Sequence, residues 1–363
     1  MRIAQISPLY ESVPPRMYGG TERVVANLTE ALIDLGHDVT LFASGDSITR
    51  ADLVPCVPTG LRLDMRSRDP LPSHVSMIDQ VAARAERFDI LHFHIDFLQF
   101  PLARLLDVPM VTTLHGRLDL PDLAPFYSSV TKAPLVSISD SQRAPMPHVN
   151  WAGTVHHGLP KDLLPFSPEA RGGYLAFLGR ISPEKRPDRA IEIAVRAGMP
   201  LKIAAKIEAA ADLDYWHDRI APMVSAHPGI EFIGEIDELE KARFLGDAAA
   251  LLFPIDWPEP FGLVMIEAMS CGTPVIAWPP GSVSEVVDPG VSGWIVDSVD
   301  AAVDAVARAR LMDRRKVRAV FETRFTSDRM ARDYLAIYAR LIGSSPRGLG
   351  GVRPTAKSLS LES

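Results

Sequence analysis

The stretch "GGTERVVANLTEALIDLGHDV", residues 19–39, shows the structural unit from which this chain is built. Two glycines open it, and Gly36 is placed to end a helix in a left-handed turn. An apolar run stands on each side, "RIAQIS" before the glycines and "DVTLFA" after Gly36. Between them, apolar residues recur at helical spacing: Val24, Val25, Leu28, Ala31, Leu32 and Leu35. The stretch therefore predicts a strand, a glycine loop, a helix and a second strand.

Strand-length apolar runs continue along the chain in two sets. The first set goes on with "DILHFHI", "MVTTLH", "LVSIS" and "GTVHHG", and the second consists of "GYLAFLG", "LKIAAK", "GIEFIG", "ALLFPI", "TPVIAW" and "GWIVD". Such runs, separated by helical segments, are typical of parallel sheets covered on both faces. The segment "GLPKDLLPFSPEARGG" between the sets has the composition of a linker. We therefore predict two doubly wound α/β domains, over residues 1–160 and 170–325.

Length and composition agree with two soluble domains. The 363 residues exceed the roughly 250–300 at which single cores stop growing. A net charge of -7 argues against general binding to nucleic acid or anionic lipid. Cys56 and Cys271 are far apart and no apolar run approaches the ~18 residues of a membrane span, so we expect a cytoplasmic protein without disulfides. The polar, aperiodic residues 344–363 predict a disordered tail.

Gly19 and Gly20 come directly before a predicted helix, where backbone N–H groups can approach a phosphate closely. A tight turn is the commoner use of such a pair. The spacing does not match the G-x-G-x-x-G fingerprint, which disfavours a dehydrogenase.

Two cations open the second domain in "LGRISPEKRPDRAIEIA". A strand is predicted to end at Leu178, and Arg180 and Lys185 follow in a loop that enters a helix near Pro187. Both should project at the carboxyl edge of the sheet, where doubly wound folds bind ligands. A forked donor and a point charge together suit a diphosphate, and a solvated surface loop is the alternative.

Two glutamates flank the start of the predicted helix in "EPFGLVMIEAMSCG". That helix should begin near Gly262 and end at Gly272, which lets Glu259 and Glu267 face one interdomain cleft. A carboxylate there is a good acceptor for paired sugar hydroxyls. The alternatives are dipole stabilisation for Glu259 and an ordinary surface position for Glu267.

Two pairs of histidines are candidate metal ligands. His92 and His94 alternate on one strand, and His156 adjoins His157. Histidines at strand ends more often have ordinary hydrogen-bond partners than a metal. We therefore expect no metal.

Together these motifs resemble glycosyltransferase family 4, whose members retain anomeric configuration and have the GT-B fold. "EPFGLVMIE" with "AMSCGTPVIAWPPGSVSEVV" resembles the family's paired glutamates and glycine turn, and "GRISPEKR" its donor-phosphate motif. "YGGTERVVANLTEALIDLGHDVTLFA" is similar to its glycine loop and first helix, and "SISDSQR" and "VHHGL" to the segments before the domain crossover. The resemblance covers residues 1 to about 342, and His157 stands where the family usually has asparagine.

The resemblance implies a fold and a set of roles. Two Rossmann-like domains would face each other across a cleft, and the last helix, residues 326–343, would cross back and complete the first domain. Glu259 would bind the transferred sugar, Glu267 the ribose, and His115 would line the sugar pocket. The remaining contacts would come from the cations Arg180 and Lys185 on the diphosphate, from the amides of Gly19, Gly20, Phe261, Gly262 and Leu263, and from Ile233 and Gly234 beside the base.

The resemblance also implies a reaction: retaining transfer of a hexose from a nucleotide-diphosphate sugar to a hydroxyl acceptor, without cofactor or metal. UDP-glucose is the first choice of donor and GDP-mannose the second. A small soluble acceptor such as a pterin or a sugar is expected, bound by loops within 44–75 and 116–130. The alternatives are a nucleotide-sugar epimerase or hydrolase of the same fold, and a non-catalytic nucleotide-sugar-binding protein. The oligomeric state is left open.

Overall fold

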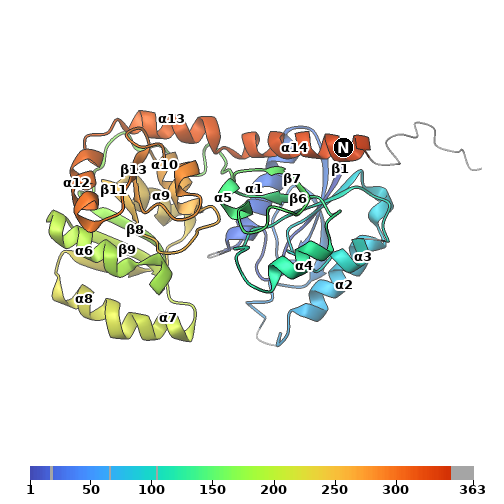
Figure 1. The fold of residues 1–363 in the computed structure, drawn as a ribbon, viewed down its shortest axis with the longest axis horizontal. Coiled ribbons are helices and arrows are strands. Elements are labelled where there is room, and N and C mark those ends of the chain that lie inside the picture. The colour runs from blue at the N-terminus through green and yellow to red at the C-terminus, as the bar shows by residue number, and fades with distance from the viewer. Residues whose placement is uncertain (17–18, 65–66, 104, 345–363) are drawn as a thin grey trace, which may run out of the picture.

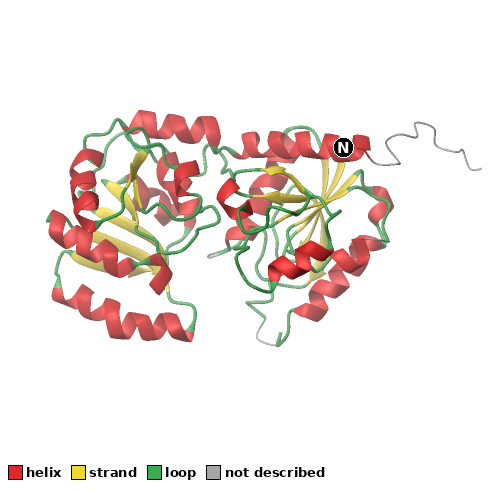
Figure 2. Ribbon diagram, in the orientation of Figure 1, coloured by secondary structure: helices red, strands yellow, loops and turns green. Residues whose placement is uncertain are grey.

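The computed structural model of the protein describes residues 1–16, 19–64, 67–103 and 105–344. Within these residues the strands form two parallel sheets in separate lobes, each covered by helices (Figures 1 and 2). The predicted pair of doubly wound α/β units is confirmed. The predicted disordered tail lies outside the described residues except for Ser344, which ends the last helix.

The first sheet consists, in spatial order, of β3 (Asp52–Val57), β2 (Asp38–Ser44), β1 (Arg2–Ile6), β4 (Ile90–Phe93), β5 (Met110–Thr113), β6 (Leu135–Ser137) and β7 (Trp151–Thr154). Its connections contain a 3-10 turn at Ala85–Arg87 and the helices α1 (Gly20–Asp34), α2 (Leu71–Ala82), α3 (Phe100–Ala103), α4 (Leu123–Ser129) and α5 (Asp140–Arg143). As predicted, Gly36 follows α1 with a φ of 83°.

The second sheet has the order β10 (Ile230–Gly234), β9 (Leu201–Lys206), β8 (Leu175–Arg180), β11 (Ala250–Phe253), β12 (Val275–Ala277) and β13 (Gly293–Ile295). Its shorter elements are a 3-10 turn at Pro183–Lys185, a π turn at Trp216–Ile220 and α11 (Val283–Val286). Its other helices are α6 (Pro187–Ala197), α7 (Ala210–Tyr215), α8 (Ala221–Ala226), α9 (Glu238–Gly246), α10 (Leu263–Ser270), α12 (Val299–Ala309) and α13 (Arg314–Arg324).

Strand order places the functional loops. In each sheet the order reverses at one point, between β1 and β4 in the first sheet and between β8 and β11 in the second. The loops that leave neighbouring strands in opposite directions open a crevice at that point, beyond the carboxyl ends. Arg180 ends β8, and the segments with Gly19 and Glu259 follow β1 and β11. The fold therefore brings residues far apart in sequence to the two crevices.

The last helix, α14 (Ser327–Ser344), returns to the first lobe and runs along α1 (Figure 1). Its buried side chains join a core of β-strand and α1 residues: Met330, Ala331, Tyr334, Ile337 and Tyr338. The chain thus passes between the lobes twice, and the two passages lie side by side. Leu159 N–H donates to Phe325 O at 2.9 Å, and Ser327 N–H donates to Leu159 O at 2.8 Å. None of the described helices has both the length and the apolar character needed to cross a membrane.

Arg314 is a buried side chain that connects several segments of the second lobe through hydrogen bonds. It begins α13, is 7% exposed, and spreads its guanidinium over backbone carbonyls. It donates to the carbonyls of Ser167, Gly246 and Ala248 at 2.8–2.9 Å and to Thr273 Oγ1 at 2.6 Å. These groups end separate segments, so one side chain satisfies acceptors that would otherwise be buried without donors.

We expect Arg314→Met to lower the free energy of unfolding by about 2–4 kcal/mol, because several buried acceptors lose a charged donor. The matched control is Arg315→Met, which changes an exposed neighbour on the same helix and should stay within about 0.5 kcal/mol of the wild type. Urea unfolding followed by tryptophan fluorescence measures both. Equal effects of the two substitutions would show that the Arg314 network adds nothing to stability.

Candidate active site

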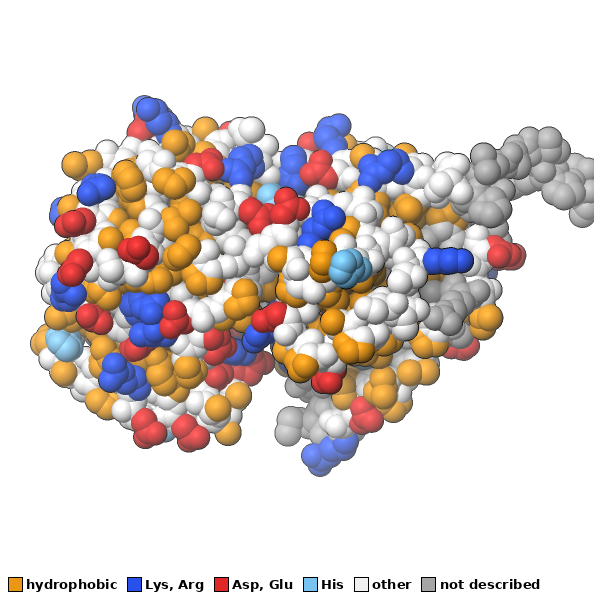
Figure 3. All heavy atoms as spheres, in the orientation of Figure 1, with side chains coloured by type: hydrophobic (Ala, Val, Ile, Leu, Met, Phe, Trp, Pro, Cys, Tyr) orange, Lys and Arg blue, Asp and Glu red, His pale blue; other side chains and the backbone are white. Residues whose placement is uncertain are grey.

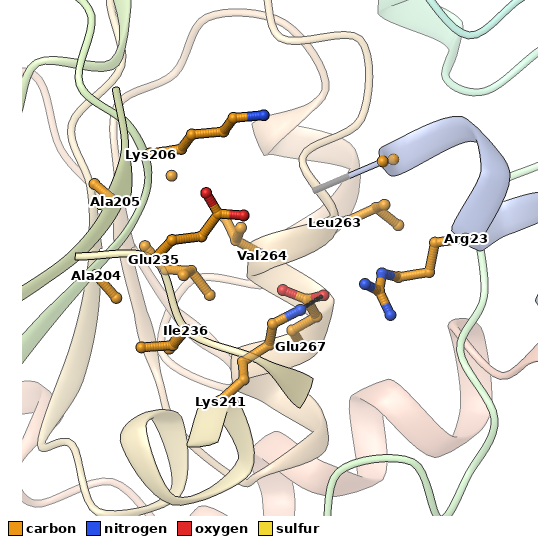
Figure 4. A pocket seen from close by; sticks show the side chains of 14 residues that line it. Arg23, Ala204, Ala205, Lys206, Glu235, Ile236, Lys241, Leu263, Val264 and Glu267 are labelled. Atoms are coloured by element: carbon orange, nitrogen blue, oxygen red, sulfur yellow. Dashed lines mark hydrogen bonds and ion pairs between the residues drawn. The ribbon is translucent and has the colours of Figure 1, made fainter. Parts of the chain in front are cut away.

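A pocket lies between the lobes, where the start of α1 faces the carboxyl ends of β8 and β9 and the first turns of α10 (Figure 4). We call it the cleft pocket, and its lining residues are Gly19, Gly20, Arg23, Leu178, Gly179, Ala204, Ala205, Lys206, Glu235, Ile236, Lys241, Leu263, Val264 and Glu267. In the surface view, acidic and basic side chains flank the notch that separates the two lobes (Figure 3). The pocket is therefore an interdomain site with charge of both signs nearby.

The glycine pair forms the first-lobe side of the cleft pocket. Gly19 is the N-cap of α1 and Gly20 its first residue, so the N-terminal end of the helix, which no described side chain caps, lies at the pocket wall. A Cβ on Gly20 would lie 3.9 Å from Leu263 Cδ1 of the other lobe. Glu22 in the same turn is buried, and this burial raises the pKa of its carboxyl above the usual value. The helix start is thus close enough to both lobes to contact a ligand between them.

Charged side chains of the two lobes face the pocket, with Lys241 beside Glu267 and Arg23 on the opposite side (Figure 4). Lys241 Nζ lies 2.8 Å from Glu267 Oε1 and 3.6 Å from Glu238 Oε2. Glu238 in turn pairs with Arg23 of α1, which joins the two lobes. Glu267 is 3% exposed, a burial that a carboxylate tolerates only with a partner such as Lys241. The sequence motifs do not single out Arg23 or Lys241, although Arg23 lies only three residues beyond the glycine pair.

The second predicted glutamate, Glu259, forms an ion pair with Lys185, the lysine predicted to bind phosphate. Lys185 ends the 3-10 turn Pro183–Lys185. Its Nζ also lies 4.5 Å from the centroid of the Trp257 ring, and Trp257 Nε1–H donates to Glu259 Oε2 at 3.0 Å. Lys185, Trp257 and Glu259 therefore form one compact cluster. Trp257 was not predicted, although it stands two residues before Glu259.

Arg180 lies within a strand rather than after one, which corrects the predicted strand end at Leu178. The ladder between β8 and β9 extends until Arg180 is opposite Lys206, which places two cations at the carboxyl edge. Arg180 pairs with Glu184 and lies 3.5 Å from Asp212 Oδ2. Arg180 therefore lies at the predicted edge of the sheet, whereas its carboxylate partners Glu184 and Asp212 were not predicted.

A second loop clamps the backbone of Glu259. Gly281 has a φ of 73°, and a Cβ on it would lie 2.3 Å from both N and O of Glu259. Ser282 N–H donates to Glu259 O at 3.0 Å, and Ser282 Oγ–H donates to Phe261 O at 2.7 Å. Only glycine allows this close approach of the two loops. The segment "WPPGS" thus fixes the position of the carboxylate.

His115 stands two residues beyond β5, and contacts between aromatic rings connect it to the second lobe. Its ring stacks on His157 with centroids 5.3 Å apart, and His157 contacts Phe261 edge to face at 4.9 Å. Burial lowers the pKa of His115 to about 3, so the imidazole is neutral at physiological pH. His157, where the resemblance leads one to expect asparagine, fills the space between His115 and Phe261.

The remaining predicted residues divide between the pocket and its supports. Leu263 lines the pocket, Phe261 is 2% exposed, and Gly262 is the N-cap of α10 with a φ of 79°. Ile233 packs on the core of the second lobe and Gly234 ends β10, whereas their neighbours Glu235 and Ile236 line the pocket.

The histidine pairs do not form a metal site in the described part of the chain, where no group of three His, Cys, Asp or Glu side chains is arranged to hold an ion. His92 and His94 have hydrogen-bond partners instead.

Two segments of the chain match known families. Residues 18–179 match the family described as Glycosyltransferase Family 4. Residues 167–324 match the family described as Glycosyl transferases group 1. The two matches together extend over both lobes.

Individual relatives align over most of the chain. Glycogen synthase of Mycobacterium tuberculosis is 27% identical, over 90% of this chain and 91% of that protein. D-inositol 3-phosphate glycosyltransferase of Kribbella flavida is 26% identical, over 80% and 82%. Phosphatidyl-myo-inositol mannosyltransferase of Mycolicibacterium smegmatis is 24% identical, over 94% and 92%.

Solved structures show the same architecture. Sucrose-phosphate synthase from Thermosynechococcus elongatus superposes with a TM-score of 0.77 at 20% identity, covering 95% of this chain and 100% of that one. HepE from Anabaena, solved with UDP and glucose, has a TM-score of 0.72 at 16% identity, covering 94% and 100%. At such identities the likeness concerns the fold alone, which is GT-B.

Gly281→Ala should lower the free energy of unfolding by about 2–4 kcal/mol, because the new Cβ meets the Glu259 backbone in addition to the positive-φ strain. Gly198→Ala is the matched control: its φ is 63° and nothing lies within 4 Å of the added atom, so it should cost only about 1–2 kcal/mol. Urea unfolding of both variants separates the clash from the strain. Equal losses would show that the two loops can separate freely.

Proposed function

Because the chain belongs to glycosyltransferase family 4, we propose that it transfers a hexose, with retention of configuration, from a nucleotide-diphosphate sugar to a hydroxyl acceptor. The observation that supports this most is the Lys185–Glu259 cluster at the second crevice. It joins a cation for the leaving phosphate directly to a carboxylate for the sugar.

The diphosphate would lie between the carboxyl edge of β8 and the start of α1. Arg180 and Lys185 supply positive charge from one lobe, and the N–H groups around Gly19 and Gly20 face the pocket from the other. In this structure the two cations are paired with Glu184 and Glu259. Phosphate oxygens would join or replace these carboxylates, so the positive charge is already in position before the donor binds.

The two buried glutamates would bind the two sugars of the donor. Glu259 stands beside Lys185 and would accept hydrogen bonds from hydroxyls of the transferred hexose. Glu267 lies farther along α10 beside Lys241 and would accept from the ribose hydroxyls. The base would then lie toward Glu235 and Ile236 at the end of β10.

The reaction would proceed by departure of the nucleoside diphosphate. The bond between the anomeric carbon and the phosphate oxygen breaks, and the negative charge that develops on this oxygen is stabilised by Arg180 and Lys185. The acceptor oxygen then attacks the same face of the sugar, and its proton passes to the departing phosphate oxygen. The two cations supply the charge that a divalent ion provides in many phosphate sites, so we propose a metal-independent reaction.

We propose UDP-glucose as the donor, with GDP-mannose as the second candidate. A structure of the same fold, HepE, contains UDP and glucose, whereas one relative is named as a mannosyltransferase. For the acceptor we propose a small soluble molecule, such as a pterin or a sugar. The free thiols Cys56 and Cys271 favour a reducing compartment, and we place the reaction in the cytoplasm.

Lys185→Ala should lower kcat for hexose transfer by about 10²- to 10³-fold, because the leaving oxygen loses a preorganised cation. The rise in the thermal midpoint on adding UDP-glucose or GDP-mannose should also shrink. The matched control is Lys316→Ala on the exposed face of α13, which should change neither. Nucleotide release that needs an acceptor would identify a transferase, and release at the same rate without one would identify a hydrolase. No midpoint shift with any nucleotide sugar would contradict the proposal.

Glu267 can be tested against the ribose directly. In the wild type, a 2′-deoxyribose analogue of the donor should bind about 10- to 100-fold more weakly than the parent, because a hydrogen bond to a charged group is lost. In Glu267→Gln the difference between the two donors should largely disappear. Glu240→Gln on the exposed face of α9 is the control. A deoxy effect that is unchanged in Glu267→Gln would place the ribose elsewhere.

A further inference from the structure

A hydrogen-bonded chain runs through the buried interior of the first lobe and ends at His115. His94 Nδ1 lies 2.8 Å from His115 Nε2, and His94 Nε2 lies 2.8 Å from Gln5 Oε1. Gln5 Nε2 lies 3.2 Å from the Tyr338 hydroxyl. Gln5 and Tyr338 are fully buried and His94 is 2% exposed. The chain therefore connects α14, through β1 and the end of β4, to the histidine beside the sugar site.

A branch extends the chain from Tyr338 on the same side of the sheet. The Tyr338 hydroxyl lies 2.6 Å from His92 Nδ1, and His92 Nε2 lies 2.7 Å from Thr113 Oγ1. Thr113 Oγ1 then lies 2.9 Å from the Tyr334 hydroxyl. His92 and Thr113 are also fully buried. Because these groups are buried, water cannot satisfy them, and each polar hydrogen needs an acceptor within the protein.

Gln5 decides the direction of the bonds that lead to His115. Its amide oxygen can only accept, so His94 must carry its proton on Nε2. His94 Nδ1 is then bare and accepts from His115, which must carry its proton on Nε2. On the other side, the Gln5 amide N–H donates to the Tyr338 hydroxyl oxygen. The hydroxyl hydrogen of Tyr338 is also buried, and donating to His92 Nδ1 satisfies it. Reversing the bond between His94 and His115 would require turning over the Gln5 amide.

We propose that Gln5, His94 and Tyr338 are positioning residues that fix His115 as the Nε2–H tautomer, leaving its Nδ1 as a hydrogen-bond acceptor for a hydroxyl of the bound sugar. The proposal rests on the hexosyltransferase function proposed above. Among the described residues, the ring of His115 forms its hydrogen bond through Nε2 to His94, which leaves Nδ1 available to a ligand.

This arrangement gives the buried polar groups a purpose beyond packing. Apolar side chains of similar size would fill the same space without any need for hydrogen-bond partners. A tautomer, in contrast, can be selected only by a polar group that accepts from, or donates to, one particular ring nitrogen. The amide of Gln5 meets that need, and Tyr338 holds the amide in one orientation from α14.

Nuclear magnetic resonance of protein labelled with ¹⁵N-histidine tests the tautomers without reference to catalysis. In the wild type, His92, His94 and His115 should all give the pattern of the Nε2–H form. In Gln5→Leu the fixed pattern of His115 should be lost, because His94 no longer has an acceptor. Gln5→Glu, which keeps the acceptor at the same place, should retain it. Tyr338→Phe keeps the ring and removes only the hydroxyl that orients the amide.

Kinetics provides the second readout. Gln5→Leu should lower kcat by roughly tenfold or more, as is typical for partners that orient a functional histidine, while Gln5→Glu should restore most of the loss. Should Gln5→Leu fail to fold, Tyr338→Phe takes its place, with a fall of the same sign. An Nδ1–H pattern for His115 in the wild type, or a pattern unchanged in both Gln5→Leu and Tyr338→Phe, would overturn the proposal. If no hexose transfer were found, the spectra would still decide the tautomer and separate the two failures.

Discussion

The constraint on which the site depends is the cost of burying two carboxylates at the cleft. Glu259 is 9% exposed and Glu267 is 3% exposed, and an unpaired charge at such depth would be strongly destabilising. Each is therefore matched by a lysine, Lys185 for the first and Lys241 for the second. The ion pairs offset the cost of burying the carboxylates and at the same time hold acceptors in place for hydroxyl groups. A ligand that offers both phosphates and paired hydroxyls can exchange with these internal partners without leaving a charge uncompensated.

The two lobes contribute different kinds of group to this balance. The second lobe supplies both carboxylates and the lysines beside them, from the loops that follow β8 and β11 and from α9 and α10. The first lobe contributes a helix start, a neutral imidazole and the cation Arg23 on the pocket wall. Arg23 pairs with Glu238 and so connects α1 with the Lys241–Glu267 pair. Contact between the lobes is thus linked electrostatically to the carboxylate proposed for the ribose.

The sequence was sufficient for the features that depend on local order. The helical spacing after Gly20 predicted α1, and apolar runs separated by helices predicted two parallel sheets. The motif residues could be placed beyond strand ends because parallel strands direct their carboxyl ends to one edge. The strand that was predicted to stop at Leu178 continues to Arg180, since its length is set by pairing with β9.

What could not be predicted depends on contacts between distant segments. Lys241 and Glu267 are 26 residues apart, and nothing in either segment specifies how α9 packs on α10. The bond between His92 and Tyr338 spans 246 residues and depends on the position of α14 along the first sheet. Short-range spacing carries no information about such pairs, and the histidines of "LHFHI" therefore allowed a metal site as well as the hydrogen-bonded chain that is present.

The return of α14 to the first lobe also has a consequence for biosynthesis. The face of α1 that this helix covers includes Val24, Leu28 and Leu32, and its partners Tyr334 and Tyr338 lie on α14, which follows the whole second lobe in the chain. During synthesis from the N-terminus, the first lobe emerges from the ribosome long before its covering helix, and domains normally fold in that order. This lobe is thus the first to be made and the last to be finished. The apolar face of α1 therefore has no α14 to pack against until the second lobe has been synthesised.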